Sequence, residues 1–292
     1  QYSRGFPGVQ TRDDRVWIER SEETIDGLAR LFADAETEAI DGYALTPDYA
    51  AGLARFLDVK WQSPPVAVKG QLIGPVSWGL TVTDQDRRSI LYDDTLAEAV
   101  AQVLRLQAMW QERALGAVSP RTILFLDEPY LSAFGSAVVP LSREQAVSLI
   151  TTVLDGISGL RGVHCCGNTD WSLLLETPLD ILSLDAYSYA LSLSLYPREV
   201  AAFLERGGSI AWGIVPNDGE ALSKESVASL ADRLEDESIG PLVKKGVPYA
   251  QLRRQALLTP SCGLSGLSAD ASARALELLA SLSEKLRQRY GE

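Results

Sequence analysis

The residues best suited to chemistry lie in one short segment, 162–171. It contains the only histidine of the chain, His164, and two of its three cysteines, Cys165 and Cys166. Side chains alternate along an extended strand, so His164 and Cys166 share one face while Cys165 lies on the other. A Gly-Asn pair interrupts the apolar run directly afterwards. The pattern predicts an imidazole and a thiol at the carboxyl end of a strand, where parallel α/β proteins carry their functional groups.

Neutral imidazole and thiolate are preferred zinc donors, so zinc chemistry with a nucleophilic thiol is the hypothesis that these residues favour. The third cysteine, Cys262, also follows a predicted strand, and Asp185 ends the strand after the His-Cys strand. A parallel barrel would bring these residues to one rim. His164, Cys166, Cys262 and either a carboxylate or a solvent position would then complete four-coordinate zinc.

A structural role is the alternative, because free cysteine is often a small buried hydrophobe and a lone histidine is often a satisfied core residue. We favour this alternative for Cys165, which faces away from the predicted site. For His164, Cys166 and Cys262, placement at strand ends favours metal binding.

Two adjacent carboxylates, Asp127 and Glu128, end another predicted strand and precede Pro129. Strand alternation lets only one of them point into the mouth of a barrel, where it would hold an ammonium group or a proton. A helix-capping or ion-pairing role is equally compatible with the sequence.

The elements that must position these residues follow from periodicity. Apolar runs of β character predict strands at 66–73, 123–128, 162–166, 181–185, 209–215 and 255–259, with a short candidate at 16–18. Three- and four-residue spacings predict helices at 22–35, 47–56, 94–116, 143–157, 171–175, 197–206, 224–234 and 269–290. The Gly-Pro after the first of these six strands predicts a long loop reaching Tyr92.

Strand-helix alternation predicts an α/β fold with a parallel sheet and right-handed crossovers. We expect a TIM (β/α)8 barrel in one domain, 1–292, of which six strands are recognisable and two are not. Because the chain starts at Gln1 and not at methionine, we expect upstream residues to be missing, and these could supply the remaining strands.

Composition narrows the class of protein. The 292 residues are 46% hydrophobic, enough for a large core. A formal net charge of -12 argues against a nucleic-acid partner. No apolar run approaches the ~20 residues that span a bilayer, and no signal pattern opens the chain. Three cysteines, two of them adjacent, fit a reducing compartment. We therefore expect a soluble, cytoplasmic protein without a membrane partner.

Four motifs resemble one superfamily, the zinc-dependent methyltransferases related to cobalamin-independent methionine synthase and to uroporphyrinogen decarboxylase. In order along the chain, the matching segments are Lys-Gly-Gln-Leu-Ile-Gly-Pro-Val at 69–76, Leu-Asp-Glu-Pro at 126–129, His-Cys-Cys-Gly-Asn at 164–168 and Thr-Pro-Ser-Cys-Gly-Leu at 259–264. The resemblance covers the chain from about residue 66 to its end, and as an ordered set the motifs are specific.

The resemblance implies a barrel of the methionine synthase/uroporphyrinogen decarboxylase type that binds Zn2+ through His164, Cys166 and Cys262. Asp185 stands where methionine synthases carry a glutamate ligand, and its shorter side chain reaches less far. By the same comparison, Asp127, rather than Glu128, would bind the amino group of homocysteine. The family's first strands, including a Gly-Ser element, have no counterpart in this chain.

The segment 213–218 contains no histidine, whereas folate-using methionine synthases have a histidine acid in the corresponding loop. A folate nitrogen is a poor leaving group without a general acid, but cob(I)alamin needs no proton. An aspartate or a tyrosine could replace the missing acid. We therefore expect a short, "core" type of methionine synthase that moves a methyl group from methylcobalamin, carried by a corrinoid protein, to the thiol of homocysteine, forming methionine.

Three other functions are compatible with these residues. Coenzyme M could be the acceptor thiol, although its sulfonate group would need a positively charged side chain at the position where Asp127 is negative. A decarboxylase of the uroporphyrinogen type uses no metal and would leave the histidine and cysteines unexplained. A non-catalytic scaffold that binds zinc or a corrinoid is the third.

Overall fold

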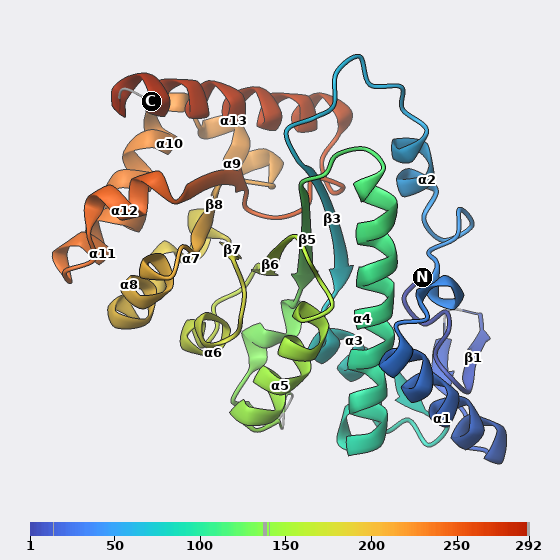
Figure 1. Cartoon of the computed structure of the whole chain (residues 1–292). Helices are drawn as coiled ribbons and strands as arrows, with labels where there is room; N and C mark the ends of the chain where they lie inside the picture. The colour runs from blue at the N-terminus through green and yellow to red at the C-terminus, as the bar shows by residue number, and fades with distance from the viewer. Residues whose placement is uncertain (14, 137–138, 140, 291–292) are drawn as a thin grey trace. The chain divides into compact units, whose positions relative to one another are not determined.

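The computed structural model describes residues 1–13, 15–136, 139 and 141–290, so the six other positions of the predicted domain 1–292 lie outside the described residues. The chain divides into two compact units (Figure 1). The first comprises Gln1–Val163 and Thr177–Leu179, and the second comprises His164–Glu176 and Asp180–Glu292. All four residues of the predicted zinc site, Asp185 included, belong to the second unit, whereas Asp127 belongs to the first.

The strands are β1 (Val9–Arg12), β2 (Arg15–Ile18), β3 (Val68–Ile73), β4 (Thr83–Asp84), β5 (Thr122–Asp127), β6 (Leu160–Cys165), β7 (Ile181–Leu184), β8 (Ser209–Val215) and β9 (Ala256–Pro260). The α-helices are α1 (Glu22–Thr37), α2 (Ala51–Leu57), α3 (Pro75–Thr81), α4 (Asp94–Gly116), α5 (Arg143–Leu154), α6 (Trp171–Glu176), α7 (Ala186–Leu193), α8 (Pro197–Glu205), α9 (Gly219–Lys224), α10 (Val227–Arg233), α11 (Gly240–Lys244), α12 (Tyr249–Arg254) and α13 (Ala269–Tyr290). Short 3-10 turns η1 (Ile40–Tyr43), η2 (Ile90–Tyr92) and η3 (Pro129–Ala133) and a π-helical turn η4 (Leu234–Ile239) complete the described elements.

Six strands form one sheet in the order β3-β5-β6-β7-β8-β9. Parallel registers join β3 to β5 in the first unit, and β7 to β8 and β8 to β9 in the second. These are the six strands predicted from the sequence, so the α/β class is confirmed. Within the described residues β3 and β9 are the two ends of the sheet, and these six strands do not by themselves close into a barrel.

Helix α4 organises the first unit. Asp93 caps its start by accepting a hydrogen bond from the backbone N–H of Leu96 (3.1 Å). Buried alanine, leucine and valine side chains line one side of the helix, which packs against β3 and β5. Helices α1 and α5 pack against α4 in turn. The predicted bounds of 94–116 are correct, because a long amphipathic pattern specifies its helix locally.

The predicted long loop reaching Tyr92 is wrong. It contains helix α3, strand β4 and the turn η2. A small second sheet, β1-β2-β4, includes β4 and the predicted strand candidate at 16–18. The start of α3 depends on a carboxylate more than fifty residues away, described below, and a local pattern cannot reveal such a partner.

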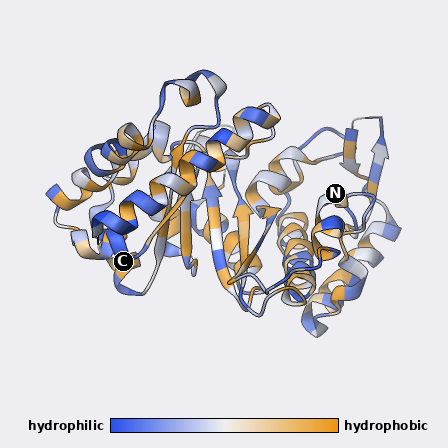
Figure 2. Ribbon diagram, turned by 90° about the horizontal axis from the view of Figure 1, so that it is seen from above, coloured by the Kyte–Doolittle hydropathy of each residue, from blue (hydrophilic) through white to orange (hydrophobic). Residues whose placement is uncertain are grey.

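In the second unit, α13 packs against β8, β9, α9 and α10. The strands of the sheet are predominantly hydrophobic in Figure 2, in keeping with the burial of six of the seven residues of β8. The predicted helix 224–234 corresponds to α10, which begins three residues later, since α9 ends at Lys224 and Ser226 caps α10 by accepting a hydrogen bond from the backbone N–H of Ser229 (3.1 Å).

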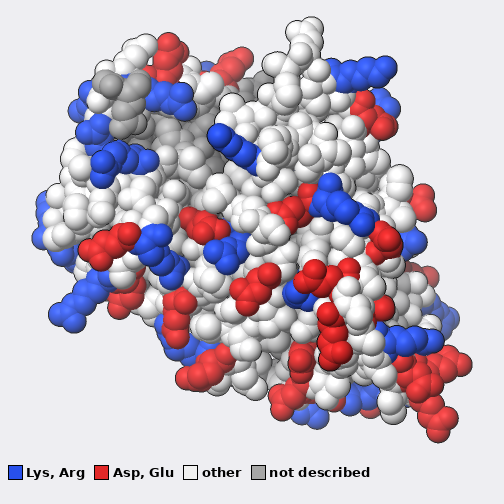
Figure 3. Space-filling view, in the orientation of Figure 1, with Lys and Arg blue, Asp and Glu red and all other residues white. Residues whose placement is uncertain are grey.

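No helix within the described residues is both long enough and apolar enough to cross a membrane. On the face shown in Figure 3, acidic and basic side chains are interspersed. The negative net charge is therefore not gathered into one patch among the described residues of that face.

Candidate metal centre

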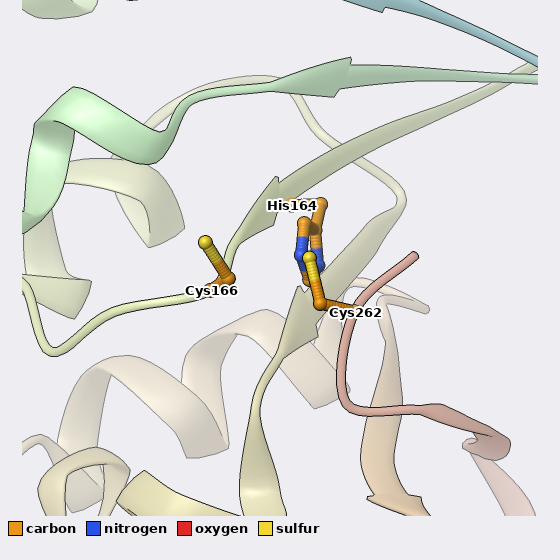
Figure 4. A group of neighbouring side chains, drawn as sticks. All are labelled: His164, Cys166 and Cys262. Carbon is orange, nitrogen blue, oxygen red and sulfur yellow. The ribbon is translucent and has the colours of Figure 1, made fainter. Parts of the chain in front are cut away.

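The second unit brings together His164, Cys166 and Cys262 (Figure 4). His164 is the penultimate residue of β6 and Cys166 follows its last residue, whereas Cys262 lies in the loop after β9. One ligand atom from each of the three side chains lies within 4.8 Å of the other two. Two segments almost a hundred residues apart therefore supply a compact imidazole-thiol-thiol group.

The orientation of His164 is fixed by the neighbouring strand. Its Nδ1 lies 3.0 Å from the hydroxyl oxygen of Ser183, in the middle of β7. Its Nε2 is buried and has no hydrogen-bond partner within the described part of the chain. Apart from the electrostatic effect of Cys262 on this imidazole, the nitrogen has no partner among the described residues, and a buried nitrogen beside two thiols is a suitable metal donor.

The loop that carries Cys262 is tied to the end of β8. The backbone N–H of Ser261 donates to the carbonyl of Val215 (2.8 Å), and the Ser261 hydroxyl donates to the side-chain oxygen of Asn217 (3.0 Å). The side-chain NH2 group of Asn217 also donates to the backbone carbonyl of Gly263 (3.3 Å). These bonds hold the residues on both sides of Cys262, and they define a positioning role for Asn217 and Ser261.

The sequence interpretation did not identify Asn217, Ser261 or Ser183. A signal existed for Ser261, which immediately precedes a candidate ligand, and for Ser183, which precedes Asp185 by two and so shares its face of the strand. No local signal pairs Asn217 with the distant Cys262 loop.

The two thiols of the group differ in acidity. The pKa of Cys262 is lowered to about 4, first by the neighbouring thiol of Cys166 and then by the imidazole of His164. The pKa of Cys166 is raised, because its thiol donates to the Cys262 sulfur and because it is partly buried. The pair therefore favours ionisation of Cys262, and thiolate is the form of cysteine that binds metals.

Asp185 is not part of this group. Its carboxylate accepts a hydrogen bond from the backbone N–H of Ser188 (2.9 Å) and caps the start of α7. Burial raises the pKa of this carboxyl group, against the effect of the hydrogen bonds from the helix. The aspartate therefore caps α7 and lies outside the group of three side chains, although the charge of Cys262 also helps to raise its pKa. Whether it binds a metal ion stays a prediction.

The chemistry of the donor set fits zinc. In tetrahedral coordination with Zn–S bonds of about 2.3 Å, two sulfurs lie about 3.8 Å apart, so the observed group requires shifts on the order of 1 Å or less. Three protein donors with a fourth position open are typical of catalytic rather than structural zinc sites. His164 Nε2, Cys166 Sγ and Cys262 Sγ are the atoms that would hold the ion.

Cys165 has the environment expected of a structural cysteine. It is fully buried, and its sulfur donates to the carbonyl of Gly167 (3.6 Å). It does not belong to the metal-binding group of described residues.

In the first unit, Asp127 ends β5 and is partly exposed. Gln71 Nε2 donates to Asp127 Oδ2 (3.1 Å), and Lys69 Nζ donates to Gln71 Oε1 (2.9 Å). Because an ammonium group can only donate, the amide oxygen of Gln71 must face Lys69 and its NH2 group must face the carboxylate. Lys69 and Gln71 therefore orient Asp127.

Glu128, unlike the partly exposed Asp127 before it, is fully buried. Its carboxylate accepts hydrogen bonds from the backbone N–H of Val76 (2.9 Å), the backbone N–H of Ser77 (2.8 Å) and the hydroxyl of Ser77 (2.6 Å). The first turn of α3 is thus capped by a carboxylate from the end of β5. A Cβ at position 74 would overlap that carboxyl group, which explains why a glycine precedes the helix.

Comparisons with known proteins support the fold. No protein-family model matches the chain, and no curated protein matches it in sequence. The structure is similar to a B12-independent methionine synthase from Shewanella sp. W3-18-1 in complex with selenomethionine, with a TM-score of 0.55 and 21% identity over 77% of this chain and 63% of that one. It is also similar to a protein assigned as a vitamin-B12 independent methionine synthase from Listeria monocytogenes, with a TM-score of 0.53 and 17% identity over 82% and 70% of the two chains. The chain spans less than two thirds of the first of these proteins.

Proposed function

We propose that the protein is a zinc-dependent methyltransferase that moves a methyl group from methylcobalamin to the thiol of homocysteine, forming methionine. The observation that carries this proposal is the convergence of His164, Cys166 and Cys262, together with a buried imidazole nitrogen that has no hydrogen-bond partner in the part of the chain that the structure describes. The likeness in fold to two proteins described as methionine synthases supports it. We also propose that the six strands belong to a (β/α)8 barrel of that type.

Bound zinc would lower the pKa of a substrate thiol and present it as a thiolate. The protein's own residues prepare for this chemistry. Cys166 and His164 favour the ionised form of Cys262, which is the form that binds metal. The bonds of Ser261 and Asn217 hold the Cys262 loop, and the capping role of Asp185 leaves a fourth position for the substrate sulfur.

The methyl donor is inferred from the loop after β8. Within it, Asn217 is engaged with the Cys262 loop, and Asp218 caps α9 by accepting a hydrogen bond from the backbone N–H of Ala221 (2.8 Å). With its carboxylate committed to a helix, Asp218 is a poor general acid for a folate nitrogen. Transfer from methylcobalamin needs no such acid, because the carbon–cobalt bond breaks with its electron pair on cobalt while the new sulfur–carbon bond forms. A corrinoid protein is the partner that this donor implies.

We keep as a prediction that Asp127 binds the amino group of homocysteine. Its orientation by Gln71 is compatible with an ammonium partner. The variant Asp127→Asn tests it through substrate choice. We expect a raised KM for homocysteine and an unchanged KM for a thiol that lacks an amino group.

The central experiment offers the zinc-loaded full chain homocysteine or coenzyme M together with methylcobalamin or methyltetrahydrofolate, and identifies the product by mass spectrometry. We expect methionine from homocysteine and methylcobalamin. Cys166→Ala should lose both zinc and turnover, whereas Cys165→Ala, the adjacent buried cysteine, should keep both.

Each other outcome assigns a different function. Methylation of coenzyme M alone would identify coenzyme M, and not homocysteine, as the acceptor. Turnover with methyltetrahydrofolate alone would identify the folate, and not methylcobalamin, as the donor. Zinc binding without methylation of any thiol would favour a scaffold. Equal loss of zinc from the two cysteine variants would contradict the assignment of the metal ligands.

A further inference from the structure

We infer that Ser183 is a positioning residue that selects the nitrogen through which His164 binds metal. The inference deepens the proposed zinc site and rests on it. Ser183 lies on β7, 6% exposed, and its hydroxyl oxygen is 3.0 Å from Nδ1 of His164. No part of the function proposed above assigns this residue a role.

The geometry separates the two ring nitrogens. Nδ1 faces the serine hydroxyl, whereas Nε2 is buried without a hydrogen-bond partner among the described residues and belongs to the side chain that groups with the two sulfurs. A neutral imidazole has one N–H and one lone pair. If Nε2 gives its lone pair to the metal, Nδ1 must carry the proton, and its N–H donates to the serine oxygen.

The hydroxyl therefore has two effects. It satisfies a buried N–H that the metal-bound tautomer creates, and it restricts rotation of the ring away from the sulfurs. Without it, the tautomer with the proton on Nε2 competes, and that tautomer cannot use Nε2 to bind metal. Partners that orient a ligand histidine in this way typically change metal affinity by about 10–100-fold when removed.

The first test measures zinc affinity by competition with a chromophoric chelator, without any need for turnover. We expect Ser183→Ala to bind zinc about 10–100-fold more weakly than the unchanged protein. Ser183→Thr, which keeps the hydroxyl, should recover most of the affinity. The matched control is Ser238→Ala, because Ser238 is a fully buried serine of the same unit whose hydroxyl has no partner in the described structure. It should leave the affinity unchanged.

The second test uses the fact that His164 is the only histidine of the chain. Protein labelled with 15N-histidine gives one imidazole pattern in long-range 1H–15N correlation spectra. With zinc or cadmium bound, we expect a protonated Nδ1 and a metal-bound Nε2. In Ser183→Ala at saturating metal, we expect faster exchange of the Nδ1 proton with solvent. Thermal unfolding followed by circular dichroism checks that each variant is folded.

The outcomes separate this inference from the proposed function. Metal bound through Nδ1, or equal zinc affinity in the folded Ser183→Ala and Ser238→Ala variants, would overturn the role of Ser183 while leaving zinc binding intact. Failure of the unchanged protein to bind zinc would instead overturn the proposed function, together with the inference that depends on it.

Discussion

Glu128 places two physical effects in direct competition. Full burial disfavours its charged form, whereas three hydrogen bonds from Val76 and Ser77 favour that form. Burial is the larger effect and raises the pKa of Glu128 from 4.5 to about 7. The difference corresponds to about 3 kcal/mol, because each pKa unit is worth about 1.4 kcal/mol.

The sign of the pH dependence follows from linkage. Between pH 4.5 and about 7 the folded protein holds a proton on Glu128 that the unfolded chain has released. Stability therefore falls as pH rises through this interval, by up to about 3 kcal/mol from this group, and the contribution is flat on either side. Glu128→Gln removes the titration, although the amide loses hydrogen bonds to Ser77 at every pH.

The assay is urea-induced unfolding of both proteins between pH 5 and 8, followed by circular dichroism. The free energy of unfolding of the unchanged protein should fall relative to that of Glu128→Gln as pH rises. Glu98→Gln, which removes an exposed carboxyl group of α4, should run parallel to the unchanged protein. A constant difference between Glu128→Gln and the unchanged protein would refute the reasoning, since it would mean that the three donors outweigh burial.

Three further outcomes are expected. Asp185→Asn keeps the cap of α7 and removes the charge, so zinc affinity measured by chelator competition should change by less than about 10-fold, the smallest loss typical even of groups that only orient a metal ligand. A larger loss would show that the carboxylate contributes to binding the ion. Gly74→Ala should lower the free energy of unfolding in urea by about 1–3 kcal/mol, because its Cβ would overlap the carboxyl group of Glu128, and unchanged stability would contradict the cap. Ser261→Ala should lower the free energy of unfolding by about 1 kcal/mol and speed zinc release to a chelator, because the Ser261 hydroxyl ties the Cys262 loop to Asn217. Release at an unchanged rate would mean that this hydrogen bond does not hold the loop.

Periodicity and strand-end position predicted the parts of this protein that local sequence determines. The six sheet strands were predicted, and the bounds of α4 and α13 were predicted without error, because their apolar spacings are long and regular. The convergence of His164, Cys166 and Cys262 followed from one rule, that parallel strands end at the same edge.

What the sequence did not predict depends on partners distant in the chain. Helix α3 begins where Glu128 caps it, and the position of the Cys262 loop depends on Asn217. Asp185 was predicted as a possible oxygen donor, yet a local signal for its capping role was present, since a helix follows it directly and Asp is a common N-cap residue.

The capping role of Asp185 also bears on the choice between a catalytic and a structural site. One neutral imidazole and two thiolates carry two negative charges, which match a divalent cation. A carboxylate ligand would add a third charge and occupy the fourth position, where a substrate sulfur would have to compete with it. Because the helix N-terminus holds this carboxylate, an ion on His164, Cys166 and Cys262 would keep a position for a thiolate from outside, as the proposed function requires. Asp185→Glu therefore has an informative expected result. The longer side chain gives up the cap for the metal, so zinc should bind more tightly while alkylation of an added thiol slows. Faster alkylation in this variant would contradict the argument that an open position is what the aspartate preserves.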